Sequence, residues 1–198
     1  MNKLAPSDLM SLEQYARERA AFRARVLRHK GARRLAIGPN ATWSFEDRLT
    51  VQYQVQEMLR VERIFEPQGI LDELGAYNPL IPDGSNWKVT LLIEFPRPEE
   101  RGRALAQLRG IEDRCWVQVA GSERVLAIAD EDLERENEEK TSAVHFLRFE
   151  LSAAMIGALR AGAALAAGID HEHYRHEMPV VPEAVRQALM NDLDLRTS

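Results

Sequence analysis

The sequence has few of the features that identify the common classes of functional site. It contains a single cysteine, Cys115, which excludes an internal disulfide, a CxxC redox pair and a cysteine-ligated iron–sulfur cluster within the chain. It contains no glycine-rich phosphate loop, no G-x-S-x-G motif and no Ser/His/Asp pattern. These absences argue against a nucleotide-dependent enzyme and against a hydrolase of the serine class.

Long apolar stretches are also missing. Residues 1–20 lack the apolar core of roughly 7–15 residues that a signal peptide needs. The longest apolar-looking stretch, residues 158–169, is interrupted by Arg160 and by glycines, and it falls short of the roughly 20 apolar residues of a membrane-spanning helix. We therefore expect a cytoplasmic protein without a membrane segment.

Charge is small in total and uneven along the chain. The formal net charge is -5, yet residues 17–34 are strongly basic and residues 130–139 are strongly acidic. An acidic total opposes nucleic-acid binding, because that function usually needs a basic surface. The basic side of the first helix is more typical of a solvated surface or of a docking surface for an acidic protein.

A regular pattern of apolar residues is present. The 198 residues are 45% hydrophobic and 29% charged, so a core can form without a structural metal. Apolar positions at helical spacing, with Ser11 and Ser152 as N-caps, predict several helices. The predicted helices are 11–30, 46–64, 98–108, 152–160 and 182–193, with a short helix that ends in a proline-rich loop within 66–84. The predicted strands are 33–37, 41–45, 87–95, 114–119, 124–129, 143–151 and 163–170. The first two could instead form one bent strand, and the spacing at 120–123 suits a hairpin.

This pattern predicts a single compact α+β domain. Two strand-helix-strand modules build a mixed β-sheet, and the N-terminal and central helices pack on it. The chain then divides into a helical N-terminal part, a sheet-forming part and a C-terminal helix. These parts are residues 1–80, 86–178 and 182–193.

The central helix carries a polar stripe beside its apolar side. At about 100° per residue, five polar side chains fall within one arc: Glu46, Thr50, Tyr53, Glu57 and Arg60. Glu57 and Arg60 are three positions apart and can pair. One interpretation is a buried network that holds the helix against the sheet. The other is a binding site in which Glu57 acts as a ligand or acid/base and Arg60 binds an anion.

Three of the five histidines lie in the segment IDHEHYRHE, residues 169–177. On a strand, His171 and His173 share a face. With a carboxylate such as Glu57 they would suit Fe, Mn or Zn in a shell of nitrogen and oxygen ligands. Tyr174 and Arg175 extend the same segment as binding candidates. The alternative is a solvated strand end, since H-x-H is a spacing of low specificity.

Two further residues are predicted to belong to the core. Cys115 shares a strand face with Val117 and Val119, which is typical of a small buried residue. His145 alternates with apolar residues, so we expect a buried, hydrogen-bonded imidazole. If its strand is parallel to the next one, His145 and His171 lie at opposite strand ends, roughly 20 Å apart. That topology excludes His145 from a site with His171.

Four stretches of the chain resemble an uncharacterised bacterial family, domain of unknown function 3501 (DUF3501). The likeness covers nearly the whole chain, and the stretches occur in the same order. They are SFEDRLTVQYQVQEMLRVERI, LGAYNPLIP, SAVHFLRFEL and IDHEHYR. The resemblance implies an accessory role in electron transfer or peroxide handling, beside rubrerythrin-like diiron proteins and iron–sulfur oxidoreductase subunits. It implies no catalytic residues.

Two functional hypotheses follow. The first is an accessory protein that docks to a rubrerythrin-like or iron–sulfur partner through the 46–60 stripe and the 170–177 segment. The second is a metal-binding protein or a metal-dependent enzyme that uses His171, His173 and Glu57. The sequence leaves open whether the chain is an enzyme.

Overall fold

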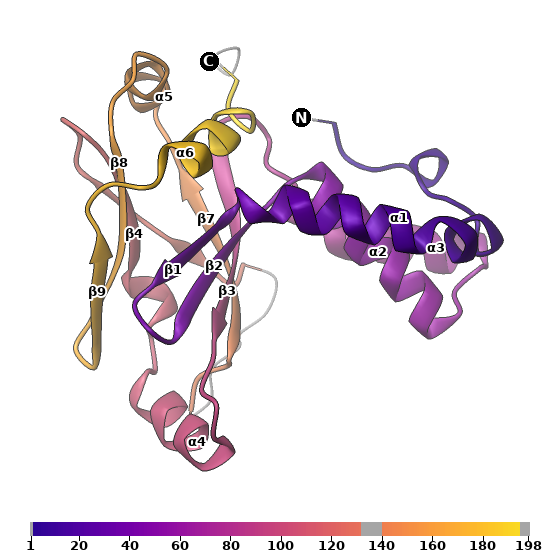
Figure 1. The fold of residues 1–198 in the computed structure, drawn as a ribbon, viewed down its shortest axis with the longest axis horizontal. Coiled ribbons are helices and arrows are strands. Elements are labelled where there is room, and N and C mark those ends of the chain that lie inside the picture. The colour runs from indigo at the N-terminus through magenta and orange to yellow at the C-terminus, as the bar shows by residue number, and fades with distance from the viewer. Residues whose placement is uncertain (1, 132–139, 195–198) are drawn as a thin grey trace.

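The computed structural model describes residues 2–131 and 140–194, and Figure 1 shows their arrangement. Within these residues the helices are α1 Leu12–Gly31, α2 Arg48–Glu62, α3 Pro67–Tyr77, α4 Pro98–Gln107, α5 Ala153–Arg160 and α6 Glu183–Met190, with 3₁₀ turns η1 Pro6–Asp8, η2 Asn78–Leu80 and η3 Glu112–Arg114. The strands are β1 Arg34–Ile37, β2 Ala41–Glu46, β3 Asn86–Ile93, β4 Cys115–Val119, β5 Arg124–Leu126, β6 Ile128–Ala129, β7 Val144–Glu150, β8 Leu165–His171 and β9 Tyr174–Met178. Of the acidic run 130–139, residues 132–139 lie outside the described residues.

Helices begin where the sequence provides a cap. The Ser11 hydroxyl accepts a hydrogen bond from the amide of Gln14 at 3.2 Å, and the Ser152 hydroxyl accepts one from Met155 at 3.3 Å. Asp47 caps α2 in the same way. Each of these side chains satisfies an amide that has no partner inside its helix. The predicted helices are confirmed, although α2 and α6 are shorter than expected.

The strands form two sheets in which every pairing is antiparallel. The larger sheet has the order β1-β2-β3-β7-β6, and the smaller has the order β5-β4-β8-β9. The predicted hairpin at residues 120–123 is confirmed, since Gln118 of β4 pairs with Arg124 of β5. The predicted strands 33–37 and 41–45 also form a hairpin, β1–β2, at the edge of the larger sheet.

The main core lies between the two sheets. Alternate residues of β2, β3 and β7 join those of β4 and β8 in one hydrophobic cluster. Trp43 stacks on Phe149 with 5.3 Å between ring centroids, and both side chains are fully buried. Cys115 belongs to the same cluster, and burial raises the pKa of its thiol. The prediction of a core cysteine is confirmed.

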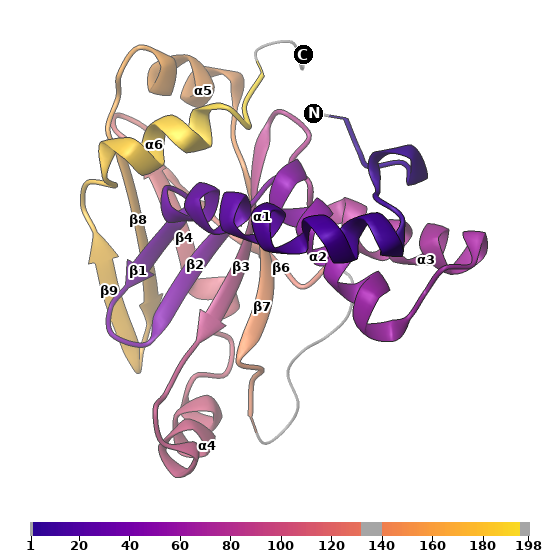
Figure 2. The same ribbon diagram turned by 45° about the vertical axis from the view of Figure 1, so that its right-hand side comes forward.

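The α+β class is confirmed, but two antiparallel sheets replace the single mixed sheet that we expected. Each strand-helix-strand module begins in the larger sheet and ends in the smaller one, as β3–α4–β4 and β7–α5–β8. Figures 1 and 2 show α4 at one end of the two-sheet sandwich and α5 at the other. The two sheets pack face to face, and each strand buries its apolar side between them. The connecting helices therefore run from one sheet to the other and do not cover the face of a sheet.

A layer formed by α1, α2 and α3 lies on the outer face of the larger sheet. In Figure 1 it projects away from β8 and β9. Helix α2 contacts both α1 and α3, and its start contacts β2. Its apolar side, with Val51, Val55 and Leu59, packs with Leu74 and Ile81 in a second, smaller cluster. Among the described residues, no helix combines the length and the apolar character needed to cross a bilayer.

Candidate metal centre

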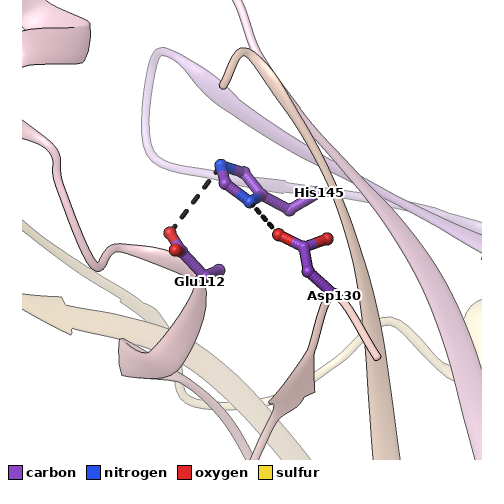
Figure 3. A group of neighbouring side chains, drawn as sticks. All are labelled: Glu112, Asp130 and His145. Carbon is purple, nitrogen blue, oxygen red and sulfur yellow. Dashed lines mark hydrogen bonds and ion pairs between the residues drawn. The ribbon is translucent and has the colours of Figure 1, made fainter. Parts of the chain in front are cut away.

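His145 lies at the centre of a group of side chains of the types that bind metals. Its imidazole is fully buried on the inner face of β7. Glu112, Asp130 and His145 each offer one ligand atom, and these atoms lie within 4.8 Å of one another. Within residues 2–131 and 140–194, no other three His, Cys, Asp or Glu residues meet that criterion. Figure 3 shows the two carboxylates approaching different nitrogens of the ring.

Asp130 binds the imidazole from the Nδ1 side. It follows β6 with a φ of 45°, a left-handed conformation that Asp adopts more readily than most residues. This turn directs the carboxylate toward β7, where Oδ1 accepts a hydrogen bond from the Phe146 amide at 2.8 Å and Oδ2 lies 2.6 Å from His145 Nδ1. Asp130 therefore favours the tautomer with hydrogen on Nδ1, which leaves the Nε2 electron pair available to a ligand.

Three oxygen atoms surround the other ring nitrogen, Nε2. Thr141 Oγ1 lies 3.0 Å away, the Ser142 carbonyl oxygen 3.1 Å, and Glu112 Oε2 3.7 Å. The backbone of Thr141 is held in place because its amide donates to the carbonyl of Leu105 at 3.1 Å. Glu112 comes from η3, the turn that precedes β4.

These separations resemble those between ligands of one divalent ion. Two atoms about 2.1 Å from an ion are about 3.0 Å apart at a right angle and about 3.4 Å apart at a tetrahedral angle. The distances from Nε2 to the Thr141 and Ser142 oxygens, 3.0 and 3.1 Å, match the separation at a right angle. The distance to Glu112 Oε2, 3.7 Å, is slightly longer than the separation at a tetrahedral angle. Hydrogen bonds alone also satisfy the ring when the Thr141 hydroxyl donates to Nε2. Geometry thus permits both a metal centre and a purely structural histidine.

Glu46 does not lie on the central helix as expected, because it is the last residue of β2 and α2 begins at Arg48. It forms a buried network with Thr50 of α2 instead. Glu46 and Thr50 are buried, and Thr50 Oγ1 donates to Glu46 Oε2 at 2.5 Å. Thr90 Oγ1 of β3 donates to Glu46 Oε1 at 2.7 Å. This network joins the start of α2 to the outer face of the larger sheet.

The second half of the stripe faces α1. Glu57 accepts hydrogen bonds from Arg19 Nε at 2.7 Å, from the Tyr15 hydroxyl at 2.6 Å and from Arg60 at 3.4 Å. These hydrogen bonds, above all those from Arg19, lower the pKa of Glu57 to about 2. Tyr53 is half-buried and packs against the buried Tyr15, Phe22 and Val26 of α1. A ligand-binding role for any of these residues stays a prediction.

His171 and His173 do not meet Glu57. Strand β8 ends at His171, where the imidazole is buried with Nε2 2.9 Å from the Arg109 carbonyl oxygen and Nδ1 3.2 Å from the His173 amide. His173 lies in the turn to β9 with 49% of its side chain exposed. Helix α2, which carries Glu57, lies on the outer face of the larger sheet, whereas β8 and β9 belong to the sheet on its inner face (Figures 1 and 2).

Tyr174 and Arg175 occupy different environments. The buried Tyr174 hydroxyl donates to the Ile37 carbonyl at 2.7 Å and accepts hydrogen bonds from two amides of the β1–β2 turn at 2.9 and 3.0 Å. It therefore holds β9 to the larger sheet. Arg175 is exposed and pairs with Asp170 at 2.7 Å. Their binding roles also stay predictions.

Sequence reasoning identified His145 correctly as a buried, hydrogen-bonded imidazole but missed its partners. Asp130 begins the acidic run 130–139, and Glu112 stands in a short turn without a recognisable pattern. One signal was available. A histidine between apolar strand residues needs a polar partner in the core. Glu112 lies just before the predicted strand 114–119, and Asp130 lies just after the predicted strand 124–129.

Comparisons with known proteins confirm the resemblance found in the sequence. A family model described as "Protein of unknown function (DUF3501)" matches residues 3–193. A crystal structure described as a novel protein of unknown function from Burkholderia pseudomallei K96243 is similar, with 50% identity and a TM-score of 0.93. The alignment covers 98% of this chain and 100% of that chain. No curated protein matches the sequence.

Proposed function

The chain belongs to the DUF3501 family, and we propose that it is a metal-binding protein with a mononuclear divalent-cation centre at His145 and Glu112. The observation that carries the proposal is the gathering of three oxygen atoms within 3.0–3.7 Å of Nε2 of a fully buried imidazole. The other ring nitrogen is already bound by Asp130.

The donor set suits a particular group of metals. His145 Nε2 and the Glu112 carboxylate would be the main ligands, and the Thr141 hydroxyl and the Ser142 carbonyl would complete a shell of one nitrogen and three oxygens. Imidazole favours Zn and Fe, whereas carboxylate and carbonyl oxygens favour Mn and Mg. The mixed set therefore points to Mn²⁺, Fe²⁺ or Zn²⁺. The two carboxylates, Glu112 and Asp130, supply charge that offsets a divalent cation.

Asp130 acts as a positioning residue in this centre. A carboxylate that holds the Nδ1 hydrogen of a ligating histidine fixes both the tautomer and the ring orientation. Asp130 is itself oriented by the Phe146 amide. Its own oxygen atoms are not ligands, because they lie on the Nδ1 side of the ring (Figure 3).

Titration of the metal-free protein with Mn²⁺, Zn²⁺ and, without oxygen, Fe²⁺ tests the proposal. Calorimetry should show one equivalent of at least one of these ions per chain. Glu112→Gln keeps the shape of the side chain and removes its charge, so it should weaken binding at least tenfold. His173→Ala, which removes an exposed imidazole, should leave the affinity unchanged.

Two results would reject the centre. One is the absence of saturable binding of all three ions at micromolar protein. The other is binding that survives Glu112→Gln but is lost in His173→Ala, since that pattern would move the site to the β8–β9 turn. Thermal unfolding of each variant verifies that the fold is intact.

A second candidate function is docking to a redox partner, as the family resemblance implies. It is favoured by three exposed apolar side chains in one segment of the helical layer: Val61, Phe65 and Leu71, exposed by 58%, 69% and 49%. Exposed apolar groups of this kind are typical of contact surfaces. A rubrerythrin-like protein should then bind the native chain more tightly than Phe65→Ser, and equal or undetectable binding of both would argue against it.

A further inference from the structure

A second site lies beside the outer face of β7, away from the imidazole of His145. A cavity of about 400 Å³ occurs where α2, α3 and η2 meet β3 and β7. Much of its wall is apolar, with Met58, Ala76, Tyr77, Leu80 and Phe146. Its volume falls within the roughly 300–1,000 Å³ that is typical of small-molecule sites.

One cation of this wall forms no hydrogen bond or ion pair within the part of the chain that the structure describes, although the carboxylates of Glu131 and Asp83 are near enough to act on its charge. Lys88 of β3 is half-buried at the cavity, and its ammonium group forms neither a hydrogen bond nor an ion pair with another described residue. Burial lowers the pKa of Lys88, although the charge of Glu131 opposes this effect. A partly desolvated ammonium without an acceptor is unfavourable, so the cavity offers a place for an anion.

The neighbouring charges are already paired with one another. Arg148 lies directly across from Lys88 on β7. Its guanidinium donates to both oxygens of Glu131 at 2.8 Å and to Glu150 at 2.6 Å. Lys88 thus stands opposite a like charge. The remaining acid of the wall, Glu73, lies near Tyr77, whose pKa is raised by burial and by Glu73.

We propose that this cavity binds a small monocarboxylate with an apolar body, such as a medium-chain fatty acid, whose carboxylate pairs with Lys88. The apolar walls would remove the chain of the ligand from water, and the carboxylate would supply the acceptor that Lys88 lacks. This site goes beyond the metal centre and does not depend on it.

Calorimetry with octanoate and 1-octanol, in the presence of EDTA, tests the proposal on the full chain. The two probes share an apolar chain and differ in the charged group. Octanoate should bind one site per chain, about tenfold more tightly than 1-octanol, because a hydrogen bond between two charged groups is stronger than one to a neutral hydroxyl. Lys88→Met should reduce octanoate binding to the level of 1-octanol and leave 1-octanol binding unchanged.

Two control variants complete the experiment. Arg101→Met removes an exposed cation of α4 outside the cavity and should change neither affinity. Ala76→Trp should fill the cavity and abolish binding of both probes. Absence of saturable octanoate binding up to millimolar concentration, equal affinity for the two probes, or octanoate binding unaffected by Lys88→Met would overturn the proposal. If Lys88→Met does not fold, Lys88→Gln serves the same comparison.

Discussion

Asp130 Oδ2 lies 2.6 Å from Nδ1 of His145, and its second oxygen accepts the amide hydrogen of the next residue of β7, Phe146. One carboxylate therefore binds both the side chain of the histidine and the backbone beside it. This contact determines which nitrogen of the imidazole faces Glu112. It also ties the end of β6 to β7, which are neighbours at the edge of the larger sheet.

Asp130→Asn should weaken metal binding without abolishing it. The amide can no longer hold the Nδ1 hydrogen as a carboxylate does, so the Nε2 electron pair is presented less often. Loss of such a partner typically costs about 10–100-fold in metal affinity. Calorimetric titration of the metal measures the change. Asp113→Asn, at an exposed position of η3, should have no effect, and equal affinity of Asp130→Asn and the native chain would contradict the positioning role.

Thr90→Val should destabilise the fold by about 1–3 kcal/mol, since it removes the shorter of two hydrogen bonds to a buried carboxylate oxygen and leaves only the one from Gln54 Nε2 at 3.4 Å. Thr90 Oγ1 donates to Oε1 of Glu46, which is 2% exposed. Thr42→Val is the matched control, because the Thr42 hydroxyl contacts Glu94 at 3.3 Å in an exposed position. Denaturant unfolding should separate the two variants; equal losses would mean that the Glu46 network contributes little.

Glu57 should make the stability depend on pH. Its pKa in the folded chain is about 2, below the ordinary 4.5, chiefly because Arg19 hydrogen-bonds the carboxylate. The folded state thus favours the charged form. Its contribution is fully present above about pH 4.5 and is lost as the pH falls toward 2. Glu57→Gln should cost about 1 kcal/mol at pH 7, a value reduced by solvent screening.

The measurement is urea unfolding of the native chain and of Glu57→Gln between pH 2 and 7. The difference between them should shrink as the pH falls below 4.5. Glu62→Gln, at the exposed end of α2, should show no such trend. A difference that is constant with pH would exclude the charge of Glu57 as its source.

Gly38→Ala should destabilise the β1–β2 hairpin more than an ordinary glycine substitution. Gly38 has a φ of +73°, and a Cβ placed there would lie 2.5 Å from the His176 ring and 2.7 Å from the Tyr174 hydroxyl. Gly121 has a φ of +83° but no atom within 4 Å of an added Cβ. We expect a loss of about 1–2 kcal/mol for Gly121→Ala from the backbone alone, and about 1–3 kcal/mol more for Gly38→Ala from overpacking. Thermal unfolding should therefore give a lower midpoint for Gly38→Ala than for Gly121→Ala, and equal midpoints would contradict the overpacking.

Helices and strands were predictable because their signals are local. Ser11 and Ser152 cap helices at the positions expected, and alternating apolar residues mark β3 and β7. Sheet pairing was not predictable in the same way, because it depends on which apolar faces meet across the core. The parallel default for a strand-helix-strand unit placed His145 and His171 at opposite strand ends, and this expectation was wrong. His145 contacts Glu112 of η3, and β8, which ends at His171, also contacts η3, so both histidines lie near the same turn.

The candidate metal centre was predictable only in part. His145 was recognised as a buried imidazole from its apolar neighbours. Glu112 and Asp130 come from a turn and from the end of a two-residue strand, and such segments carry no periodic pattern that predicts where a side chain points. The spacing of His171 and His173 predicts only that they lie close together on one strand face. In the structure His171 contacts the Arg109 carbonyl and the His173 amide. These contacts satisfy its ring nitrogens within the β8–β9 hairpin and the loop before η3.

Anomalous X-ray scattering from crystals grown with Mn²⁺ or Zn²⁺ tests the metal centre most directly. We expect one strong peak between His145 Nε2 and Glu112, with Asp130 still bound to Nδ1 on the other side of the ring. A peak at the β8–β9 turn beside His173, or no peak near His145 in crystals that contain the ion at saturating concentration, would contradict it.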